Sequence, residues 1–296
     1  MSVYPFIEAE KAAACNVARA CALMAVSRSA FYLWSRHEPG PRARADADLV
    51  PQIAEIHKDS RGTYGAPRVT VALARGGTRV GRKRVARLMA RRGLAGRTRR
   101  RFVRTTVADP AATKLAPDRL GRLFAPGSCA LDRVYVGDIT CIRTHEGWLY
   151  LATRLDLASR RVVGFSMAEH MRASLACDAL AMAIGARQAG PGFLFHSDRG
   201  SQSTSHAFRA LLDQHAGLQS LSRPRQCRDN AVAESFFATL KEELVHRQAW
   251  ATRAAARAAV FEFIEVFYNR RRLHSSLGNL TSAEYEAQRR QLSEAA

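Results

Sequence analysis

The sequence lacks the features of a secreted, zinc-bound or membrane-spanning protein. Its six cysteines form no CxxC pair, which argues against a structural zinc site. No uninterrupted apolar run approaches the length that crosses a bilayer. The opening stretch MSVYPFIEAEK carries charges at Glu8, Glu10 and Lys11, unlike a signal peptide. We therefore expect a cytoplasmic protein with reduced thiols and no membrane partner.

Acidic residues are also missing from one long window. The chain of 296 residues holds 46 Lys and Arg against 26 Asp and Glu, a net charge of +20. Residues 67–108 contain no Asp or Glu but fourteen Lys and Arg. Such a run repels itself in isolation, and a DNA duplex, with one phosphate charge per about 1.7 Å, relieves that repulsion. The charge therefore predicts a polyanionic partner, and we expect DNA and an association with the nucleoid.

Helical order runs through this basic window. PRVTVALAR is typical of one helix, Gly76-Gly77 of a turn, and VGRKRVARLMARRG of a second helix. Val85, Leu88 and Met89 form one apolar stripe on the second helix. This layout is that of a helix-turn-helix, and the alternative is a solvated helix hairpin. We expect DNA contacts from the basic residues of the second helix, which are Arg82, Lys83, Arg84, Arg87 and Arg91.

Two further segments precede and follow this window. Residues 12–36 indicate a weaker helical pair whose second helix Ser27 can cap. That pair is either another helix-turn-helix or a helical pair that completes a core. EPGPRARADAD, at 38–48, predicts a linker because Pro39, Gly40 and Pro41 break helices. Residues 98–128 are polar, contain three prolines, and predict a basic tether.

The periodicity changes near residue 130. RVYVGDITCIRT, WLYLATRLDLAS and RVVGFSMAE predict three strands, with a hairpin turn at 145–147 between the first two. A helix at SLACDALAMAIGARQAG, a strand at FLFHSD, a helix at SHAFRALLDQHAG, a strand at LQSLS and a helix at DNAVAESFFATLKEEL follow. This order predicts an α/β domain with a sheet of mixed direction.

Three carboxylates fall on separate elements of this domain. Asp138 lies within the first strand, Asp198 ends the strand FLFHSD, and Glu234 lies about one turn inside the last helix. Asp229 and Asn230 can cap that helix. Buried acids are costly unless they are paired or bind metal, and three of them can hold two Mg²⁺ ions for phosphoryl transfer. Taken singly, each acid also has an ordinary interpretation as a hydrogen-bonded, turn or solvated residue.

The chain resembles the DDE transposases and retroviral integrases, and among them the bacterial insertion-sequence transposases encoded by a second, frameshifted reading frame. Four stretches carry the resemblance: DIT at 138–140, HSDRGSQ at 196–202, DNAVAESFFATLKEE at 229–243 and FYNRRRLHSSLG at 267–278. It covers nearly the whole chain. It implies a ribonuclease-H-like α/β core with a mixed sheet, preceded by helix-turn-helix-like DNA-binding segments.

We expect five parts on this basis. They are an N-terminal helical segment at 1–45, a basic DNA-binding domain at 46–108, a linker at 109–129, an integrase-like catalytic core at 130–246 and a C-terminal helical extension at 247–296. The resemblance makes Asp138, Asp198 and Glu234 the catalytic, metal-binding acids, with two Mg²⁺ ions or Mn²⁺ in their place. It gives Lys241, two turns beyond Glu234, a DNA contact, against the alternative of an ion pair on its own helix.

The resemblance also implies the reaction and the partners. The expected reaction is Mg²⁺-dependent strand cleavage and strand transfer, in which water frees a 3′-hydroxyl that attacks a second phosphodiester. The expected partners are the terminal inverted repeats of the element, target DNA, an upstream-frame transposase protein as fusion or partner, and further copies of this chain on DNA. His196 and Ser197 would shape the site, and His274 would belong to a packing or DNA-contact element.

The chain departs from the family pattern in the loop before the last helix. Arg225 stands where we expect glycine and Arg228 where we expect an aromatic residue. Glycine often serves a turn with positive φ, which arginine tolerates poorly. The two arginines either loosen the loop or add phosphate contacts. A catalytically decayed, DNA-binding derivative or a repressor is therefore the alternative function, and Tyr268 beside three arginines suggests a tyrosine recombinase as a third.

Overall fold

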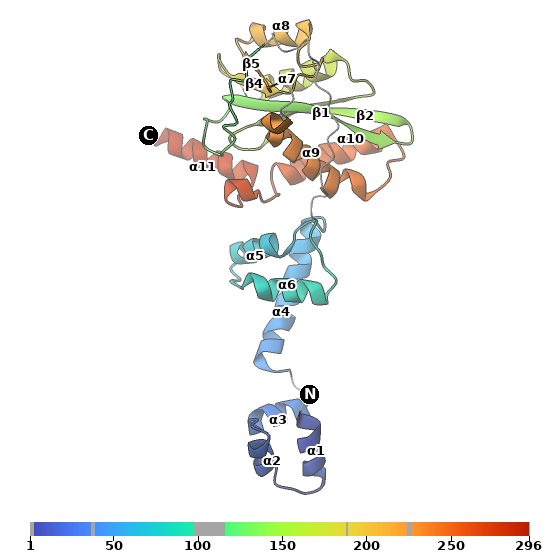
Figure 1. Cartoon of the computed structure of the whole chain (residues 1–296), viewed down its shortest axis with the longest axis vertical. Coiled ribbons are helices and arrows are strands. Elements are labelled where there is room, and N and C mark those ends of the chain that lie inside the picture. The colour runs from blue at the N-terminus through green and yellow to red at the C-terminus, as the bar shows by residue number, and fades with distance from the viewer. Residues whose placement is uncertain (1–2, 37–38, 98–115, 188, 224–226, 296) are drawn as a thin grey trace. The chain divides into compact units, whose positions relative to one another are not determined.

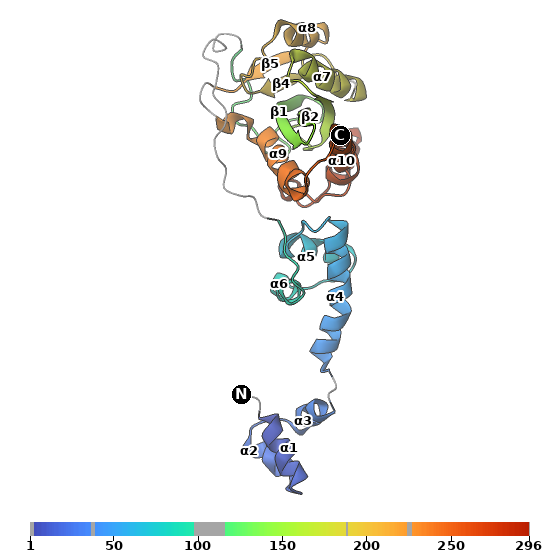
Figure 2. The same ribbon diagram turned by 90° about the vertical axis from the view of Figure 1, so that its right-hand side faces the viewer.

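The computed structural model describes residues 3–36, 39–97, 116–187, 189–223 and 227–295 (Figure 1). The chain divides into two compact units, Met1–Gly96 and Arg97–Ala296. The described part of the first unit is helical, whereas the second holds a sheet with helices on both faces (Figures 1 and 2). Within these residues no helix is both long and apolar enough to cross a bilayer.

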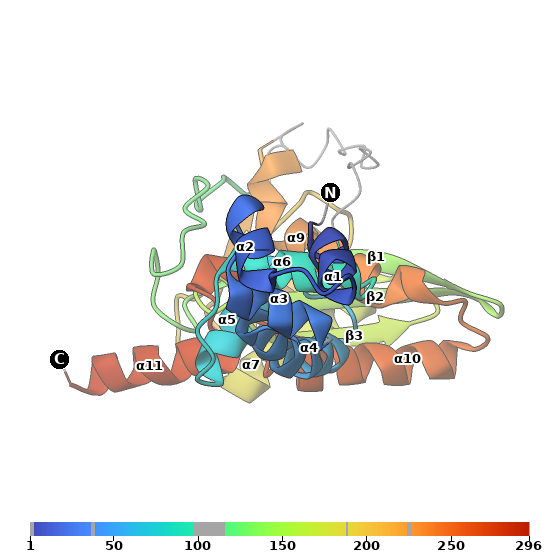
Figure 3. The same ribbon diagram turned by 90° about the horizontal axis from the view of Figure 1, so that it is seen from below.

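The first three helices pack on one another. They are α1 (Tyr4–Ala12), α2 (Val17–Leu23) and α3 (Arg28–Ser35), and each contacts the other two (Figure 3). Ile7, Cys21 and Phe31 are buried between them. The side chain of Ser27 accepts a hydrogen bond from the backbone N–H of Ala30, so the predicted cap of the third helix is confirmed. The helical pair thus completes a small core with α1.

The next three helices form the basic part of the first unit. They are α4 (Pro41–Asp59), α5 (Ala66–Arg75) and α6 (Arg82–Arg91), and they too contact one another. The predicted helix pair and the apolar stripe of Val85, Leu88 and Met89 are confirmed, since all three side chains are buried. The prediction of a linker through residue 48 is wrong, because α4 begins at Pro41. Proline is tolerated at the start of a helix, because the backbone N–H that it lacks would have no partner within the first turn.

A mixed five-stranded sheet forms the second unit, as predicted. Its order is β3-β2-β1-β4-β5, with β1 antiparallel to β2, β2 antiparallel to β3, and parallel pairs β1–β4 and β4–β5. Alternating apolar residues make the first three strands, and short apolar runs make the last two. The strands are β1 (Val134–Thr144), β2 (Gly147–Asp156), β3 (Val162–Ala168), β4 (Leu194–Ser197) and β5 (Leu218–Leu221).

Helices cover both faces of this sheet (Figure 1). On one face α7 (Ala173–Arg187) and α8 (His206–Gln214) bury a core with Tyr135, Phe193 and Phe195. On the other lie α9 (Ala231–Glu243) and α10 (Arg253–Glu262), both in contact with β1 and β2. A π-helix (Phe263–Tyr268) extends α10, and α11 (Ser282–Glu294) ends the described chain.

The FYNRRRLHSSLG stretch is a packing element. The side chain of Asn269 donates to the carbonyl of Val162 at 2.9 Å and accepts from its N–H at 3.0 Å. His274 is only 5% exposed, which favours the packing alternative for this residue. Tyr268 is only 4% exposed and packs edge-on against Phe236. Because this tyrosine has almost no access to solvent, it is not placed to attack DNA as the nucleophile of a tyrosine recombinase.

Part of the expected tether is attached to the core. Residues 98–115 lie outside the described residues, but from Ala116 onward the chain runs along β5. The backbone N–H of Arg119 donates to Ser220 Oγ at 2.9 Å, and that of Leu221 donates to the carbonyl of Pro117 at 3.3 Å. Leu120 is buried. The expected linker is therefore docked along β5 through residues 117–120, and the boundaries of the five parts stay a prediction.

Candidate active site

The strand register brings two of the three acids together. In the parallel pair β1–β4, Val136 lies opposite His196 and Gly137 opposite Ser197. Asp138 is the next residue of β1, and Asp198 directly follows the carboxyl end of β4. Because adjacent strands lie about 4.8 Å apart, the sheet places these two acids side by side.

The third acid comes from α9. Asn230, at the start of this helix, donates from Nδ2 to the carbonyl of Gly137 at 3.3 Å, directly beside Asp138. Glu234 follows Asn230 by four residues and therefore lies on the same helix face. The prediction that Asp229 and Asn230 cap this helix is wrong: no side chain caps its first turn, since Asn230 is engaged with β1. That contact aims Glu234 at the strand that carries Asp138.

The charges of the three carboxylates affect one another. Burial and the charge of Asp198 raise the pKa of Asp138 to about 8, and the charge of Glu234 adds to the effect. Burial raises the pKa of Asp198. Burial and then Asp198 raise the pKa of Glu234. Like charges that approach each other in a partly dry site disfavour their own ionisation, so the group is poised for a positive partner.

Backbone donors hold the two aspartates in place. The N–H of Ile139 donates to Asp138 Oδ1 at 2.7 Å, and the N–H of Gly200 donates to Asp198 Oδ1 at 3.1 Å. Carboxylate oxygens are the ligands that hard divalent cations prefer. Among the described residues, however, no three His, Cys, Asp or Glu side chains lie close enough to form a ready metal cluster. The acids have the donor chemistry of a Mg²⁺ site without its closed geometry.

A buried arginine behind the site escaped sequence analysis. Arg154 is 1% exposed, donates from Nη2 to the carbonyl of Ala176 at 2.8 Å, and stacks over Phe195 at 4.8 Å. Burial lowers its pKa to about 10, against the opposing effect of the Asp138 charge. A Cβ on Gly137 would lie 2.7 Å from Arg154 Nη1, so glycine makes room for the guanidinium. No local sequence pattern predicts that a positively charged side chain on a strand is buried.

The basic residues predicted to contact DNA fall into two groups. Arg84 Nε and Arg87 Nη2 pair with the two oxygens of Asp46 on α4, at 2.6 and 2.7 Å. The acid-free window thus receives a counter-charge from outside itself. The other predicted contacts on α6, Arg82, Lys83 and Arg91, are exposed.

Lys241 lies two turns beyond Glu234 on α9 and is half-buried. The alternative prediction was an ion pair on its own helix. Within the described part of the chain its ammonium group makes no salt bridge and no hydrogen bond. The neighbouring Glu242 approaches His246 instead, at 3.7 Å. The lysine is therefore left available to a ligand.

The sequence predicts that Arg225 and Arg228 either loosen the loop before α9 or add phosphate contacts. Arg225 and the side chain of Arg228 lie outside the described residues. The backbone at 227–230 forms a 3₁₀ turn that leads into α9. An arginine at 228 is therefore compatible with an ordered start of the helix.

The chain is similar to known protein families and, at low identity, to solved structures. Family models described as an integrase core domain match residues 130–227 and 234–289, and one described as an HTH-like domain matches residues 43–102. In solved structures, the catalytic core domain of BIV integrase aligns at 17% identity over 55% of this chain and 99% of its own, with a TM-score of 0.41. The simian T-cell lymphotropic virus intasome aligns at 15% identity over 79% of this chain and 74% of its own, with a TM-score of 0.45.

Curated relatives cover almost the whole chain. The insertion element IS600 uncharacterized 31 kDa protein of Shigella sonnei is 39% identical over 92% of this chain and 99% of its own length. Transposase InsF for insertion sequence IS3A of Escherichia coli (strain K12) is 37% identical over 96% of this chain and 98% of its own length. On this similarity the chain belongs to the insertion-sequence transposase family that includes InsF of IS3.

Proposed function

We propose that this transposase is a DDE polynucleotidyl transferase that cuts and joins DNA at the ends of an insertion sequence, with Asp138, Asp198 and Glu234 as its catalytic acids. The observation that carries the proposal is the pairing of β1 with β4, together with the contact between the start of α9 and β1. Adjacent strands supply the aspartates, and a helix tied to the carbonyl of Gly137 supplies the glutamate. The charges of Asp198 and Glu234 disfavour ionisation of Asp138, and the charge of Asp198 disfavours ionisation of Glu234.

The three acids would hold two Mg²⁺ ions, or Mn²⁺ in their place. When bound, such ions supply activation of an attacking oxygen and stabilisation of a leaving one. The chain itself supplies position. Backbone N–H groups orient Asp138 and Asp198, and the Asn230 contact orients α9. Because phosphoryl transfer needs little covalent chemistry from the protein, preorganised position and charge account for most of its contribution.

Two groups of cations would position the DNA. Lys241 stands on the helix of Glu234 and would contact the phosphate next to the reacting bond. Arg82, Lys83 and Arg91 on α6 would contact the duplex backbone. Water would attack first and free a 3′-hydroxyl, which then attacks a second phosphodiester. Two DNA ends must be held for this exchange, so we propose a homo-oligomer on DNA and an upstream-frame partner protein.

A cleavage assay separates this function from that of a decayed, DNA-binding derivative. Full-length protein is incubated with labelled terminal DNA of its own element in Mg²⁺ or Mn²⁺, beside Asp138→Asn and Glu234→Gln. We expect nicking and joining by the wild type, loss of both in each variant, and unchanged DNA binding in a gel-shift assay. A wild type that binds terminal DNA but never nicks it in either metal, even with the upstream-frame protein added, would establish the decayed derivative instead.

A further inference from the structure

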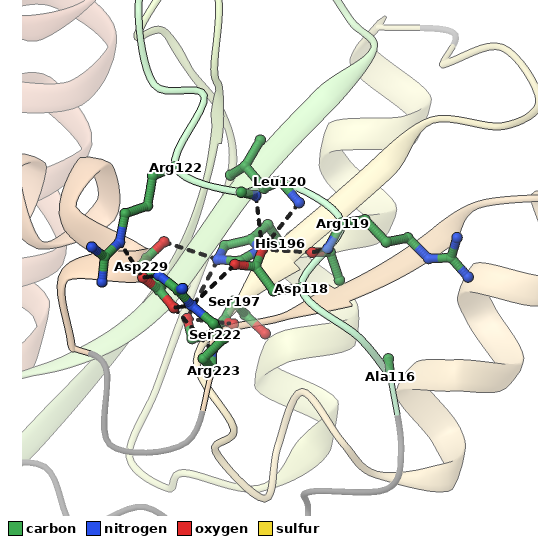
Figure 4. A network of polar contacts seen from close by, with 12 residues as sticks. Ala116, Asp118, Arg119, Leu120, Arg122, His196, Ser197, Ser222, Arg223 and Asp229 are labelled. Carbon is green, nitrogen blue, oxygen red and sulfur yellow. Dashed lines mark hydrogen bonds and ion pairs between the residues drawn. The ribbon is translucent and has the colours of Figure 1, made fainter.

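One buried carboxylate joins three separate segments next to the proposed site (Figure 4). Asp229, the second-last residue before α9, is only 1% exposed. Its Oδ1 accepts from Arg122 Nε at 2.6 Å and from Arg223 Nη2 at 3.0 Å. Its Oδ2 accepts from Arg223 Nε at 2.9 Å and from the Arg223 backbone N–H at 3.0 Å. Arg122 lies on the segment that docks along β5, residues 116–122 (the connector), and Arg223 follows β5. Asp229 therefore holds both against the start of α9.

The backbone of the same residue is tied to β4. His196 is fully buried and lies two positions before Asp198. Its Nε2 is 2.9 Å from the carbonyl of Asp229, and its Nδ1 is 2.8 Å from Ser220 Oγ. A carbonyl only accepts, so Nε2 carries the proton and Nδ1 accepts from the serine.

That serine links the histidine back to the connector. The N–H of Arg119 donates to Ser220 Oγ, whose own proton goes to His196. The hydrogen bonds therefore run in one direction, from the connector through β5 and β4 to the start of α9. Each buried polar group in this series is satisfied by the next, which makes the arrangement rigid.

We propose that Asp229 and Arg122 are positioning residues, and that their ion pair holds α9 so that Glu234 meets Asp138 and Asp198. The inference rests on the proposed catalytic role of Glu234. Glu234 lies five residues beyond Asp229. Without Arg122 the Asp229 carboxylate keeps its hydrogen bonds from Arg223 but loses its side-chain link to the connector, so the start of α9 is held less firmly. A shift of about 1 Å in a catalytic group can cost about a hundredfold in rate. The connector is thereby a part of the catalytic apparatus rather than a passive tether.

The test compares two neighbouring arginines of the connector. Arg122→Gln removes the ion pair, and Arg122→Lys keeps the charge. Arg119→Gln is the matched control, because Arg119 is exposed and its guanidinium points away from Asp229 (Figure 4). The assays are single-turnover cleavage of terminal DNA by the full chain, affinity for that DNA, and the rise in melting temperature on adding Mg²⁺ without DNA.

We expect Arg122→Gln to slow cleavage by about tenfold or more, to leave DNA affinity within about twofold, and to need more Mg²⁺ for half of the melting-temperature rise. Arg122→Lys should recover most of the rate, and Arg119→Gln should match the wild type. Asp229→Asn should behave as Arg122→Gln does.

Four outcomes are decisive. Expected behaviour of the variants supports the proposal. Wild-type rate and Mg²⁺ response in Arg122→Gln, with Glu234→Gln inactive, overturn the positioning role while leaving the proposed function intact. Equal loss of cleavage, DNA affinity and helix content by circular dichroism, unrelieved in Arg122→Lys, shows a purely structural role and also overturns it. A wild type that neither cleaves nor responds to Mg²⁺ overturns the proposed function and this inference together.

Discussion

At the scale of single residues, the proposed site stores electrostatic repulsion. Burial disfavours the charged form of Asp138, and the charges of Asp198 and Glu234 disfavour it further. The backbone N–H of Ile139 offsets only part of that cost. A protein selected for stability alone would not gather three such groups at a strand's end, so the arrangement points to a bound cation as the group that balances it.

The first prediction concerns the pH dependence that follows. The folded-state pKa of Asp138 is about 8 and the unfolded value is 3.8, so between these values the folded protein keeps a proton that the unfolded chain has lost. This contribution to stability is therefore lost as the pH rises from about 4 to about 8. In EDTA, Asp138→Asn should raise the melting temperature by about 2–4 °C at pH 8 and flatten its fall with pH.

Thermal melts by circular dichroism measure this effect, with Asp178→Asn as the control because Asp178 is exposed on α7. A lower melting temperature for Asp138→Asn than for the wild type at pH 8 would contradict the repulsion.

At the scale of elements, α9 is held at both ends. Asn230 ties its start to β1. Near its end Glu243 and Arg272 form a salt bridge at 2.7 Å, with side chains 6% and 8% exposed. A helix fixed in this way presents Glu234 at a constant height above the strands. The FYNRRRLHSSLG stretch supplies Arg272 and so contributes to the site from a distance.

The second prediction tests this buried pair. Glu243→Gln leaves the Arg272 guanidinium buried without its counter-ion, which should destabilise the protein by about 3 kcal/mol. The double substitution Glu243→Met, Arg272→Met should cost less, because it removes both charges. Urea denaturation measures both. Glu169→Gln, at an exposed ion pair with Arg253, should stay within about 0.5 kcal/mol of the wild type. If the double variant is less stable to urea than Glu243→Gln, the loss in Glu243→Gln does not come from a buried charge left unpaired.

The third prediction concerns α6, whose cations serve two purposes. Replacing Arg82, Lys83 and Arg91 together by Gln should lower DNA affinity and reduce the slope of log affinity against log salt by about 3, since each phosphate contact contributes about 0.9. Fluorescence anisotropy of the full chain across a salt series measures the slope. An unchanged slope would show that this helix does not meet phosphates.

The other two arginines of α6 provide the contrast. Asp46→Asn frees Arg84 and Arg87 and removes a negative charge. It should lower the melting temperature of the helical unit without weakening DNA binding, because the positive charge facing the duplex does not fall.

At the scale of the whole molecule, the two compact units carry different functional residues. The helical unit carries the acid-free basic window, and the sheet unit carries the three acids. The fourth prediction concerns the three acids of the sheet unit. A ligand that binds only the folded state raises stability with its concentration. Mg²⁺ should therefore raise the melting temperature of the wild type and leave that of the double variant Asp138→Asn, Asp198→Asn unchanged.

Differential scanning calorimetry of the full chain, with and without Mg²⁺, checks this prediction. An equal shift in the double variant would place the effect at another cation site. Na⁺ at matched ionic strength controls for screening of the net charge of +20.

The sequence by itself determined the local elements and their chemistry. The helices α5 and α6, the alternating strands of the sheet and the helix of Glu234 follow from periodicity and turn residues, which act between near neighbours in the chain. The four family stretches, the excess of positive charge and the three acids could also be read directly. Each of these features depends on residues that are close together in sequence, or on sums that need no geometry.

Only the tertiary structure decided which distant groups meet. Asp46 became the counter-ion of Arg84 and Arg87, Asn230 turned from a helix cap to a partner of Gly137, and the connector docked through Arg122 on Asp229. No spacing rule predicts such pairs, because each depends on how separate elements pack. Polar groups enclosed by that packing must find partners wherever the fold supplies them, since leaving them unpaired away from water costs too much free energy.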